Sequence, residues 1–236
     1  MSEYVGSYAQ RLAWLTGFEG SAGSAVVLPQ EAAIFVDGRY TLQVRSQVDG
    51  KDWSYQSVPE TSVADWLKEH APQGARIGYD PWLHSRDWVK KATEALSARG
   101  AELVAVEQNP IDKVWSNRPE ASKAHLIVQP DQYAGRSSAD KRHEIADWLE
   151  KQDADAAVLS ALDSIAWAFN VRGADVSRTP VALAFALVRS DGTADLYVDP
   201  EKVSNEVSTG TARYSGLRVA MAAADSTTTT EIASSA

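Results

Sequence analysis

Short apolar runs alternate with segments of helical period along this chain, and that alternation restricts the fold more than any other feature of the sequence. The runs Ser24–Leu28 and Ala32–Val36 flank Pro29-Gln30-Glu31 and predict a hairpin on a buried sheet. After a turn at Asp37-Gly38-Arg39, the pattern indicates helix, helix, strand, helix and strand over residues 40–48, 63–67, 76–80, 88–96 and 102–106. Such an order predicts a mixed α/β layer fold.

A second stretch of the same kind begins after residue 138. Its expected elements are a helix, a strand, a short apolar helix or turn, and two further strands, over Lys141–Lys151, Ala156–Leu159, Ser164–Phe169, Ala182–Val188 and Ala194–Val198. Ser190-Asp191-Gly192 has the chemistry of a hairpin turn between the last two strands. Between the two stretches, Asn109–Pro119 breaks the pattern, so we expect a domain boundary near Pro119–Tyr133.

The two stretches also echo each other. Leu12-Ala13-Trp14 precedes a glycine-containing turn and two strands that end at Asp37, and Ile165-Ala166-Trp167 precedes Arg172-Gly173 and two strands that end at Asp199. Chance can produce so short a match, but the order of elements repeats as well. A duplicated α/β domain explains both observations most economically.

These patterns divide the chain into three parts. We predict a first domain over residues 1–118 and a second over residues 119–207. Residues 208–236 are rich in Ser, Thr, Ala and Gly, include the run Thr227–Thr230, and carry too little apolar surface to offset the entropy of ordering. We therefore expect a disordered or non-native tail there.

Composition excludes several functions. The formal net charge of −9 disfavours nucleic acid, whose phosphates require a positive surface. The chain has no cysteine, so it has no disulfide framework and no thiolate chemistry. Neither a signal-peptide pattern nor an apolar run of membrane-spanning length is present, so we expect a soluble, cytoplasmic protein without a membrane partner.

The sequence offers no recognisable catalytic or metal-binding constellation, and we predict neither kind of site in this chain. The four histidines are widely separated, without His-x-His or His-Glu-x-x-His spacing. Asp153 and Asp155 are best explained as a solvated turn. Gly17, Gly20 and Gly23 precede a strand, whereas the glycines of phosphate-binding loops follow one, so a structural turn is favoured there.

Four residues are candidates for a position facing a cleft. Asp37 and Arg39 flank Gly38, and they either face a cleft or form an internal ion pair that fixes the turn, which we favour. Arg172, which follows Asn170, could steer a peptide carbonyl or carboxylate through its guanidinium group. A salt bridge between domains, from Arg172 to Asp175 or Asp163, is an equal alternative.

Seven of the eight tryptophans fall into two predicted groups. Trp14, Trp66, Trp148 and Trp167 lie on apolar faces and are expected in the core. The tryptophans near turns, Trp53, Trp82 and Trp115, are expected to serve as interface anchors.

Several blocks of sequence, taken in order, resemble one family. They are Arg11-Leu-Ala-Trp-Leu-Thr-Gly-Phe-Glu-Gly-Ser-Ala-Gly23, Phe35-Val-Asp-Gly-Arg-Tyr-Thr-Leu-Gln43, Ile77-Gly-Tyr-Asp-Pro81, Asn109-Pro-Ile-Asp-Lys-Val-Trp115, Arg118-Pro119, Lys141-Arg142 and Leu162-Asp-Ser-Ile-Ala-Trp-Ala-Phe-Asn-Val-Arg-Gly-Ala-Asp175. Together they cover roughly residues 2–203 and resemble the Xaa-Pro aminopeptidases (aminopeptidase P) of the three-domain type.

The resemblance implies an α/β fold of two tandem creatinase-N-terminal-like (ribonuclease H-like) three-layer domains with mixed sheets. It also implies that the first βα unit of domain I and the whole catalytic domain are missing. In the full-length family that domain holds a dinuclear site, usually described with manganese, on two Asp, one His and two Glu, and it removes an N-terminal residue that precedes proline. We therefore expect no cofactor in this chain, and peptides with proline in second position as partners only through the missing domain.

Two functions follow as hypotheses. The first is the non-catalytic N-terminal region of an Xaa-Pro aminopeptidase, acting in substrate gating, domain packing and homo-oligomerisation, with the chain alone inactive. The alternative is a free-standing creatinase-like module for binding or oligomerisation without enzymatic activity.

Overall fold

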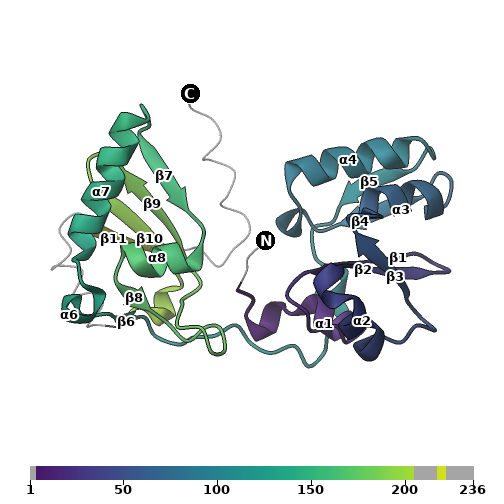
Figure 1. The fold of residues 1–236 in the computed structure, drawn as a ribbon, viewed down its shortest axis with the longest axis horizontal. Helices are drawn as coiled ribbons and strands as arrows, with labels where there is room; N and C mark the ends of the chain where they lie inside the picture. Colours follow the sequence, from purple (N-terminus) through teal and green to yellow (C-terminus); the bar gives the residue numbers. More distant parts are fainter. Residues whose placement is uncertain (1–3, 205–216, 222–236) are drawn as a thin grey trace. The chain divides into compact units, whose positions relative to one another are not determined.

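The computed structural model describes residues 4–204 and 217–221. They divide into two compact units: unit 1, residues 8–119, and unit 2, residues 120–204 and 217–221 together with residues 4–7. Both units combine helices with sheets that contain parallel and antiparallel strand pairs, which confirms the predicted mixed α/β class (Figure 1). No helix among the described residues has both the length and the hydrophobicity that crossing a bilayer requires.

Unit 1 contains two sheets. Its elements are α1 (Arg11–Thr16), β1 (Gly23–Val27), β2 (Ala32–Asp37), η2 (Gly38–Tyr40), α2 (Thr41–Gln47), β3 (Ser54–Val58), α3 (Val63–His70), β4 (Arg76–Tyr79), α4 (Arg86–Ser97), β5 (Glu102–Ala105) and α5 (Pro110–Val114). The first sheet has the order β1-β2-β3, in which β1 is antiparallel and β3 parallel to β2. The second consists of β4 and β5 alone, paired in parallel.

Local sequence explains where two helices of unit 1, α3 and α4, begin. The hydroxyl of Ser62 accepts a hydrogen bond from the Asp65 N–H at the start of α3, and Ser85 does the same for Trp88 at the start of α4. Such N-caps satisfy backbone donors that have no partner within the helix. The helices can therefore bury Trp66, Leu67 and Leu96 in one apolar cluster, which also contains Phe35 of β2.

Unit 2 contains one larger sheet and a short strand pair. Its elements are β6 (Ile127–Val128), α6 (Asp131–Ala134), α7 (Ser138–Lys151), β7 (Ala156–Leu159), α8 (Leu162–Ala168), β8 (Val171–Arg172), β9 (Phe185–Arg189), β10 (Ala194–Val198), η4 (Pro200–Lys202) and β11 (Leu217–Met221). The four-stranded sheet has the order β11-β10-β9-β7, with β9 antiparallel to both neighbours and β11 parallel to β10. β6 pairs with β8.

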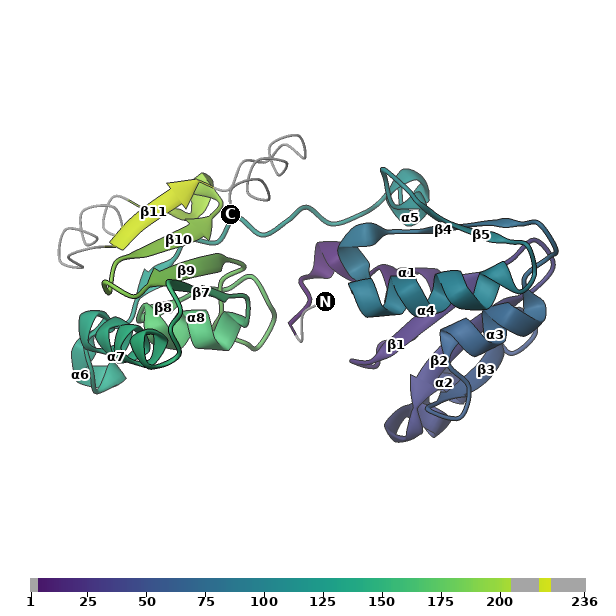
Figure 2. The same ribbon diagram turned by 90° about the horizontal axis from the view of Figure 1, so that it is seen from above.

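Side-chain alternation in this sheet decides which face is covered. Ala186 and Val188 of β9 and Leu196 of β10 are buried, whereas Phe185 on the opposite face is exposed. Successive side chains of a strand point to opposite faces, so one face carries the core. α7 and α8 lie on the same side of the sheet (Figure 2), and the apolar side of α8 joins the buried cluster of the sheet.

The predicted internal echo is present in the folded chain. Each unit has a helix, an antiparallel strand pair, a short 3-10 helix and a strand parallel to the second strand of that pair, which are α1, β1, β2, η2 and β3 in unit 1 and α8, β9, β10, η4 and β11 in unit 2. The repeat is interrupted by α2 before β3 and by β8 before β9. The residue three positions after the tryptophan has a positive φ in both units, Gly17 at 79° and Asn170 at 48°. Asp37 and Asp199 each accept a backbone N–H at the start of the 3-10 helix.

Three parts of the structure differ from the sequence predictions. β3 and α1 were not expected, because Ser54–Val58 is largely polar and Arg11–Thr16 is short. Residues 217–221 depart from the predicted disordered or non-native tail over 208–236, because they form β11 and pair with β10. Polar strands are stabilised by the neighbour to which they hydrogen-bond, a contact that local composition does not encode. The rest of 208–236 lies outside the described residues.

Candidate functional site

The most unusual group of side chains in unit 2 surrounds the corner between α6, α7 and α8. Lys141 of α7 is buried, and its Nζ donates to Asn170 Oδ1 at 2.6 Å and to the Trp167 carbonyl at 3.1 Å. The same Nζ lies 4.9 Å from the centroid of the Trp167 ring. A buried ammonium group is thus held by two neutral acceptors and the face of an aromatic ring, which attracts a cation.

Asn170 connects the segments around this lysine. Its side chain is only 1% exposed, and its Nδ2 donates to Asp131 Oδ1 at 3.0 Å and to the Arg136 carbonyl at 2.8 Å. Its backbone carbonyl accepts from the Gln129 N–H at 2.7 Å. The left-handed conformation directly after α8 is one that Asn tolerates better than most residues. Asn170 therefore fixes the corner through both its side chain and its backbone.

Electrostatics at this corner are set by burial and by neighbouring charges. Burial lowers the pKa of Lys141, and the positive charges of Arg172 and Arg136 lower it further, while Asp131 opposes them. Desolvation disfavours the charged form of an amine, and like charges nearby act in the same direction. We call Lys141, Asn170, Asp131 and the Trp167 ring the Lys141 network.

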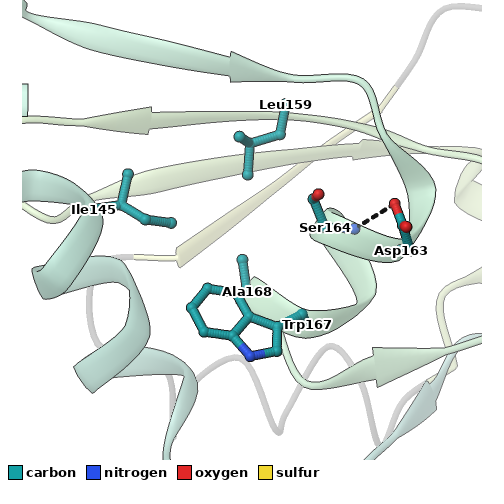
Figure 3. A pocket seen from close by; sticks show the side chains of 6 residues that line it. All are labelled: Ile145, Leu159, Asp163, Ser164, Trp167 and Ala168. Carbon is teal, nitrogen blue, oxygen red and sulfur yellow. Dashed lines mark hydrogen bonds between the residues drawn. The ribbon is translucent and has the colours of Figure 1, made fainter. Parts of the chain in front are cut away.

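An open apolar groove lies beside the Lys141 network. It has a volume of about 430 Å³ and is lined by Ile145 of α7, Leu159 of β7, and Asp163, Ser164, Trp167 and Ala168 of α8. Figure 3 shows Leu159, Ile145 and Trp167 approaching it from three different elements, with the Ser164 N–H donating to Asp163 Oδ1 at 2.9 Å. Because Trp167 belongs to both features, the buried network positions an aromatic wall of the groove.

Arg172 lies in β8, near the same corner. Its Nη1 donates to the carbonyls of Ala166 at 2.9 Å and Val171 at 2.8 Å. Asp175, one of the two partners considered for it, instead pairs with Lys202 at 2.8 Å inside unit 2. The guanidinium is therefore engaged with the end of α8, and its charge acts on Lys141.

Asp37 and Arg39 are brought together in unit 1. Arg39 donates from Nη2 to Asp37 Oδ2 at 2.7 Å and from its backbone N–H to Asp37 Oδ1 at 3.0 Å. These hydrogen bonds lower the pKa of Asp37. The Arg39 side chain is 67% exposed. The pair thus fixes the turn between β2 and η2 on the surface of unit 1, and it lies in a different unit from Asn170 and Arg172.

Sequence reasoning missed two polar centres. One is Lys141, whose position on the helix face toward Asn170 became visible only once α7 packed on α8. The other is the buried ion pair of Lys202 with Asp175, whose side chains are 5% and 0% exposed. The sequence signal that could have identified Lys141 is a lysine on the apolar face of a helix. Lys is rarely buried without a partner, so such a lysine predicts a polar neighbour.

The tryptophan predictions were right for Trp66, which is buried, and wrong for several others. Trp148 is 56%, Trp167 is 46% and Trp14 is 38% exposed, so none of the three is a core residue. Trp115 is buried and stacks on Trp14 with ring centroids 5.5 Å apart. Helical periodicity identified an apolar face in each case, but that face packs only at its edge against the next element.

A dinuclear metal does not fit the residues described here. Within residues 4–204, no group of three or more His, Asp or Glu side chains comes close enough to hold a metal ion. His70 bonds to Glu31, and His84 bonds to the Asp80 carbonyl. No step of a metal-dependent reaction can therefore be assigned to these side chains.

Two tandem α/β units with mixed sheets, which repeat a helix, an antiparallel strand pair, a 3-10 helix and a parallel strand, define the class of this protein. The model of the creatinase/prolidase N-terminal domain matches residues 4–114, and a second model of the same description matches residues 117–234. The chain belongs to the creatinase/prolidase N-terminal domain family and consists of two such domains in tandem.

The relatives are Xaa-Pro aminopeptidases. The chain is 38% identical to aminopeptidase P1 of Lotus japonicus, over 87% of this chain and 31% of the relative. It is 41% identical to a probable Xaa-Pro aminopeptidase P of Chaetomium globosum, over 87% of this chain and 33% of the relative. The chain thus corresponds to the N-terminal part of these enzymes and spans about a third of their length.

A solved structure has the same fold. The X-prolyl aminopeptidase of Caenorhabditis elegans, described as a cytosolic enzyme with a di-nuclear active site, superposes with a TM-score of 0.82 and 30% identity. The superposition covers 92% of this chain and 36% of that enzyme. The resemblance stated from the sequence blocks is confirmed, as is the fold of two creatinase N-terminal domains.

Proposed function

We propose that this chain acts as the non-catalytic N-terminal region of an Xaa-Pro aminopeptidase, in substrate gating, domain packing and oligomerisation. The observation that carries the proposal is the match to the N-terminal third of such enzymes across both tandem domains. On this proposal, peptides with proline in second position are substrates of the whole protein. A dinuclear metal, with manganese as the expected ion, would then be held outside residues 4–204.

The contribution of this chain would be steric and electrostatic. Unit 2 offers a wall that is fixed by the Lys141 network and ends in the exposed ring of Trp167. In unit 1, Asp37 and Arg39 form a rigid charged turn. Rigid walls beside an active site select substrates by shape and exclude folded chains, without taking part in bond cleavage. We propose Arg172, Asn170, Asp37 and Arg39 as residues that shape or support such walls.

A chimera tests this proposal. The chain replaces the matched N-terminal third of a relative such as aminopeptidase P1, and hydrolysis of an Arg-Pro-Pro peptide is measured with added manganese. We expect the chimera to cleave the peptide, while this chain alone and the relative without its N-terminal third both fail to do so. A chimera that folds but cleaves no faster than the truncated relative would contradict the proposal, as would turnover by this chain alone.

The exposed apolar groove favours the second candidate, a binding or oligomerisation module without enzymatic activity. That function predicts self-association or ligand binding by the chain together with an inactive chimera. Sedimentation velocity across a range of protein concentrations measures the self-association. We place either form of the protein in the cytoplasm, as the C. elegans enzyme is described, and subcellular fractionation checks this.

A further inference from the structure

The chain passes between its two units twice, before Tyr8 and after Pro119. We call the chain between Tyr4 and Tyr8 the first connection, and the chain between Arg118 and Leu126 the second. On the unit 2 side, both connections end at one apolar cluster, against which Tyr4 packs and to which the buried Leu126 belongs. Two connections restrain a pair of domains more than one does, provided that their ends stay together. The contacts at the ends in unit 1 therefore matter for how the units can move.

Arg118 joins the two ends in unit 1. Its Nε donates to the Tyr8 carbonyl at 2.7 Å, although the two residues are 110 positions apart in sequence, and its Nη1 lies 2.9 Å from Asp112 Oδ2. The guanidinium carbon lies 5.7 Å from the centroid of the Tyr8 ring and 6.0 Å from that of the Trp115 ring. A guanidinium group presents its donors in a fixed planar fork and stacks on aromatic faces, so one side chain can serve all these partners.

Further contacts fix Asp112, the carboxylate that Arg118 uses. Arg11 of α1 binds it in a bidentate manner, from Nε to Oδ1 at 2.7 Å and from Nη2 to Oδ2 at 2.8 Å. The Trp14 ring of α1 stacks on Trp115 at the end of α5, with centroids 5.5 Å apart. The three charged side chains are only partly exposed, so water and salt screen their attraction incompletely. α1 and α5 are therefore tied together next to the two connections.

These contacts give a role to two sequence blocks that the proposed function leaves unexplained. Asn109–Trp115 contains the aspartate and one of the stacked tryptophans, and Arg118-Pro119 contains the arginine. Proline fixes its own φ and disfavours a helical conformation in the residue before it. The second connection therefore leaves unit 1 from a stiff point.

We propose that Arg118 is a hinge anchor. It ties the two connections together where they leave unit 1, so that the units move about one pivot that both connections share. Arg118 does this through its bonds to the Tyr8 carbonyl and to Asp112, without contact to a substrate. The proposal concerns the mechanics of the chain and does not depend on the enzymatic role proposed above.

The first connection sets the size of the expected effect. Only residues 5–7 lie between Tyr4, which packs in unit 2, and Tyr8, which Arg118 holds in unit 1. If the anchor no longer holds Tyr8, the chain is free up to the start of α1. The free segment then grows from three residues (5–7) to six (5–10). The root-mean-square length of a flexible segment rises with the square root of its residue number, which is an increase of about 1.4-fold.

Distances between spin labels on the two units test the hinge anchor. The chain has no cysteine, so Lys68→Cys and Lys151→Cys, at exposed positions of α3 and α7, provide two unique labelling sites. Pulsed electron paramagnetic resonance records the distribution of distances between the labels in the full chain and in its Arg118→Met variant. We expect the distribution to be about 1.4 times as wide in Arg118→Met.

Two further variants separate the hinge anchor from a general effect on folding. Arg118→Lys keeps a cation for Asp112, but an ammonium group lacks the planar fork that reaches both Asp112 and the Tyr8 carbonyl, so we expect an intermediate width. Arg11→Met removes the other arginine from Asp112 and leaves the bond between Arg118 and Tyr8, so the width should not change. Hydrogen exchange followed by mass spectrometry should be faster in residues 8–10 only when Arg118 is changed.

Three results would overturn the proposal. The same distance distribution in Arg118→Met and in the original chain would mean that Arg118 does not limit the motion of the units. Equal broadening in Arg11→Met would assign the effect to a loss of stability in unit 1. If Arg118→Met does not fold, Arg118→Lys decides alone, and an unchanged distribution or unchanged exchange of residues 8–10 in that variant contradicts the hinge anchor.

Discussion

In unit 2 the first strand of the β9–β10 pair lies between two neighbours and buries its inward residues, whereas in unit 1 the corresponding strand, β1, lies at an edge and stays largely exposed. The helix, the left-handed residue, the antiparallel pair and the aspartate-capped 3-10 helix are otherwise the same. A local pattern can therefore specify the same set of elements twice. The neighbour available to one strand decides whether the sheet becomes continuous.

The two units also hold their charges differently. Unit 2 buries the pair Lys202–Asp175, whereas unit 1 places Asp112 between Arg11 and Arg118 at 2.7 and 2.9 Å, with partial exposure of all three. Burial makes a pair costly to break, because the remaining charge is left without water. Three partly exposed groups can lose one member and keep an ion pair. The comparison predicts unequal responses to matched substitutions.

The largest expected effect is that of Lys202→Met. Removing one partner leaves the buried carboxylate of Asp175 without a counter-charge, so we expect the free energy of unfolding of unit 2 to fall by about 3–5 kcal/mol. Arg11→Met in unit 1 is the matched control and should cost about 1 kcal/mol, since Asp112 retains Arg118. Urea unfolding followed by segment-resolved hydrogen exchange measures both. Equal losses of stability in the two variants would contradict the expectation that the buried pair of unit 2 is costlier to break than the partly exposed one of unit 1.

Asn170→Gly should have the next largest effect. Glycine keeps the left-handed backbone but removes the shortest hydrogen bond of the buried Lys141 ammonium, so we expect a loss of about 1.5–3 kcal/mol in unit 2. The reciprocal change in unit 1, Gly17→Asn, should cost about 1 kcal/mol, because it places a side chain at a positive φ. Thermal unfolding of both variants compares them. If Asn170→Gly were harmless, the Lys141 network would have no structural role.

The difference between β9 and β1 predicts a smaller contrast. Val188→Ala removes two buried carbons and should destabilise unit 2 by about 1.5 kcal/mol. Val26→Ala, at a partly buried position of β1, should cost roughly half as much. Denaturant titration gives both values. A larger loss for Val26 would mean that the edge of β1 is already covered in solution.

Acid should affect unit 1 through Asp112. The hydrogen bond from Arg11 lowers the pKa of Asp112 from its ordinary value of 3.8. The unfolded state therefore binds the proton first, so this contribution is complete above pH 3.8 and is lost as the pH falls through the folded pKa. Asp112→Asn should flatten that part of the stability profile. If the dependence of stability on pH in acid were the same in Asp112→Asn as in the original chain, Asp112 would not be the group responsible.

Alkali should increase the stability of unit 2, and this is the smallest effect that we expect. Because burial lowers the pKa of Lys141 from 10.5, the unfolded state binds more protons between the two pKa values. The stability of unit 2 should therefore rise with pH in that interval and level off above pH 10.5. Lys141→Met should abolish the rise. Titration of the Nζ by NMR provides a direct measurement of the pKa.

Most regular elements could be predicted from local pattern. The helix over Lys141–Lys151 and the strand over Ala156–Leu159 appear in α7 and β7, and the hairpin expected over residues 24–36 is β1 and β2. In each case the spacing of apolar side chains is a property of the segment itself. β3 was missed because its residues are largely polar, and β11 because residues 208–236, which contain it, are rich in Ser, Thr, Ala and Gly. Both strands are stabilised mainly by the strand beside them.

The candidate site was much less predictable. Asn170 and Arg172 were singled out, but their partners are Lys141, Asp131 and backbone carbonyls that only the packing of α6, α7 and α8 brings together. The prediction that Trp167 lies in the core was wrong for the same reason, since its side chain is 46% exposed. Periodicity identifies an apolar face, but the depth to which that face is covered depends on elements distant in sequence.

The sequence by itself determined the α/β class, the tandem repeat and the family, because these depend on the type and order of residues along the chain. Only the tertiary structure decided which charges are buried and which sheet edge stays open. Both outcomes depend on contacts between residues far apart in sequence, where desolvation and strand pairing are decided by the neighbours that the fold supplies.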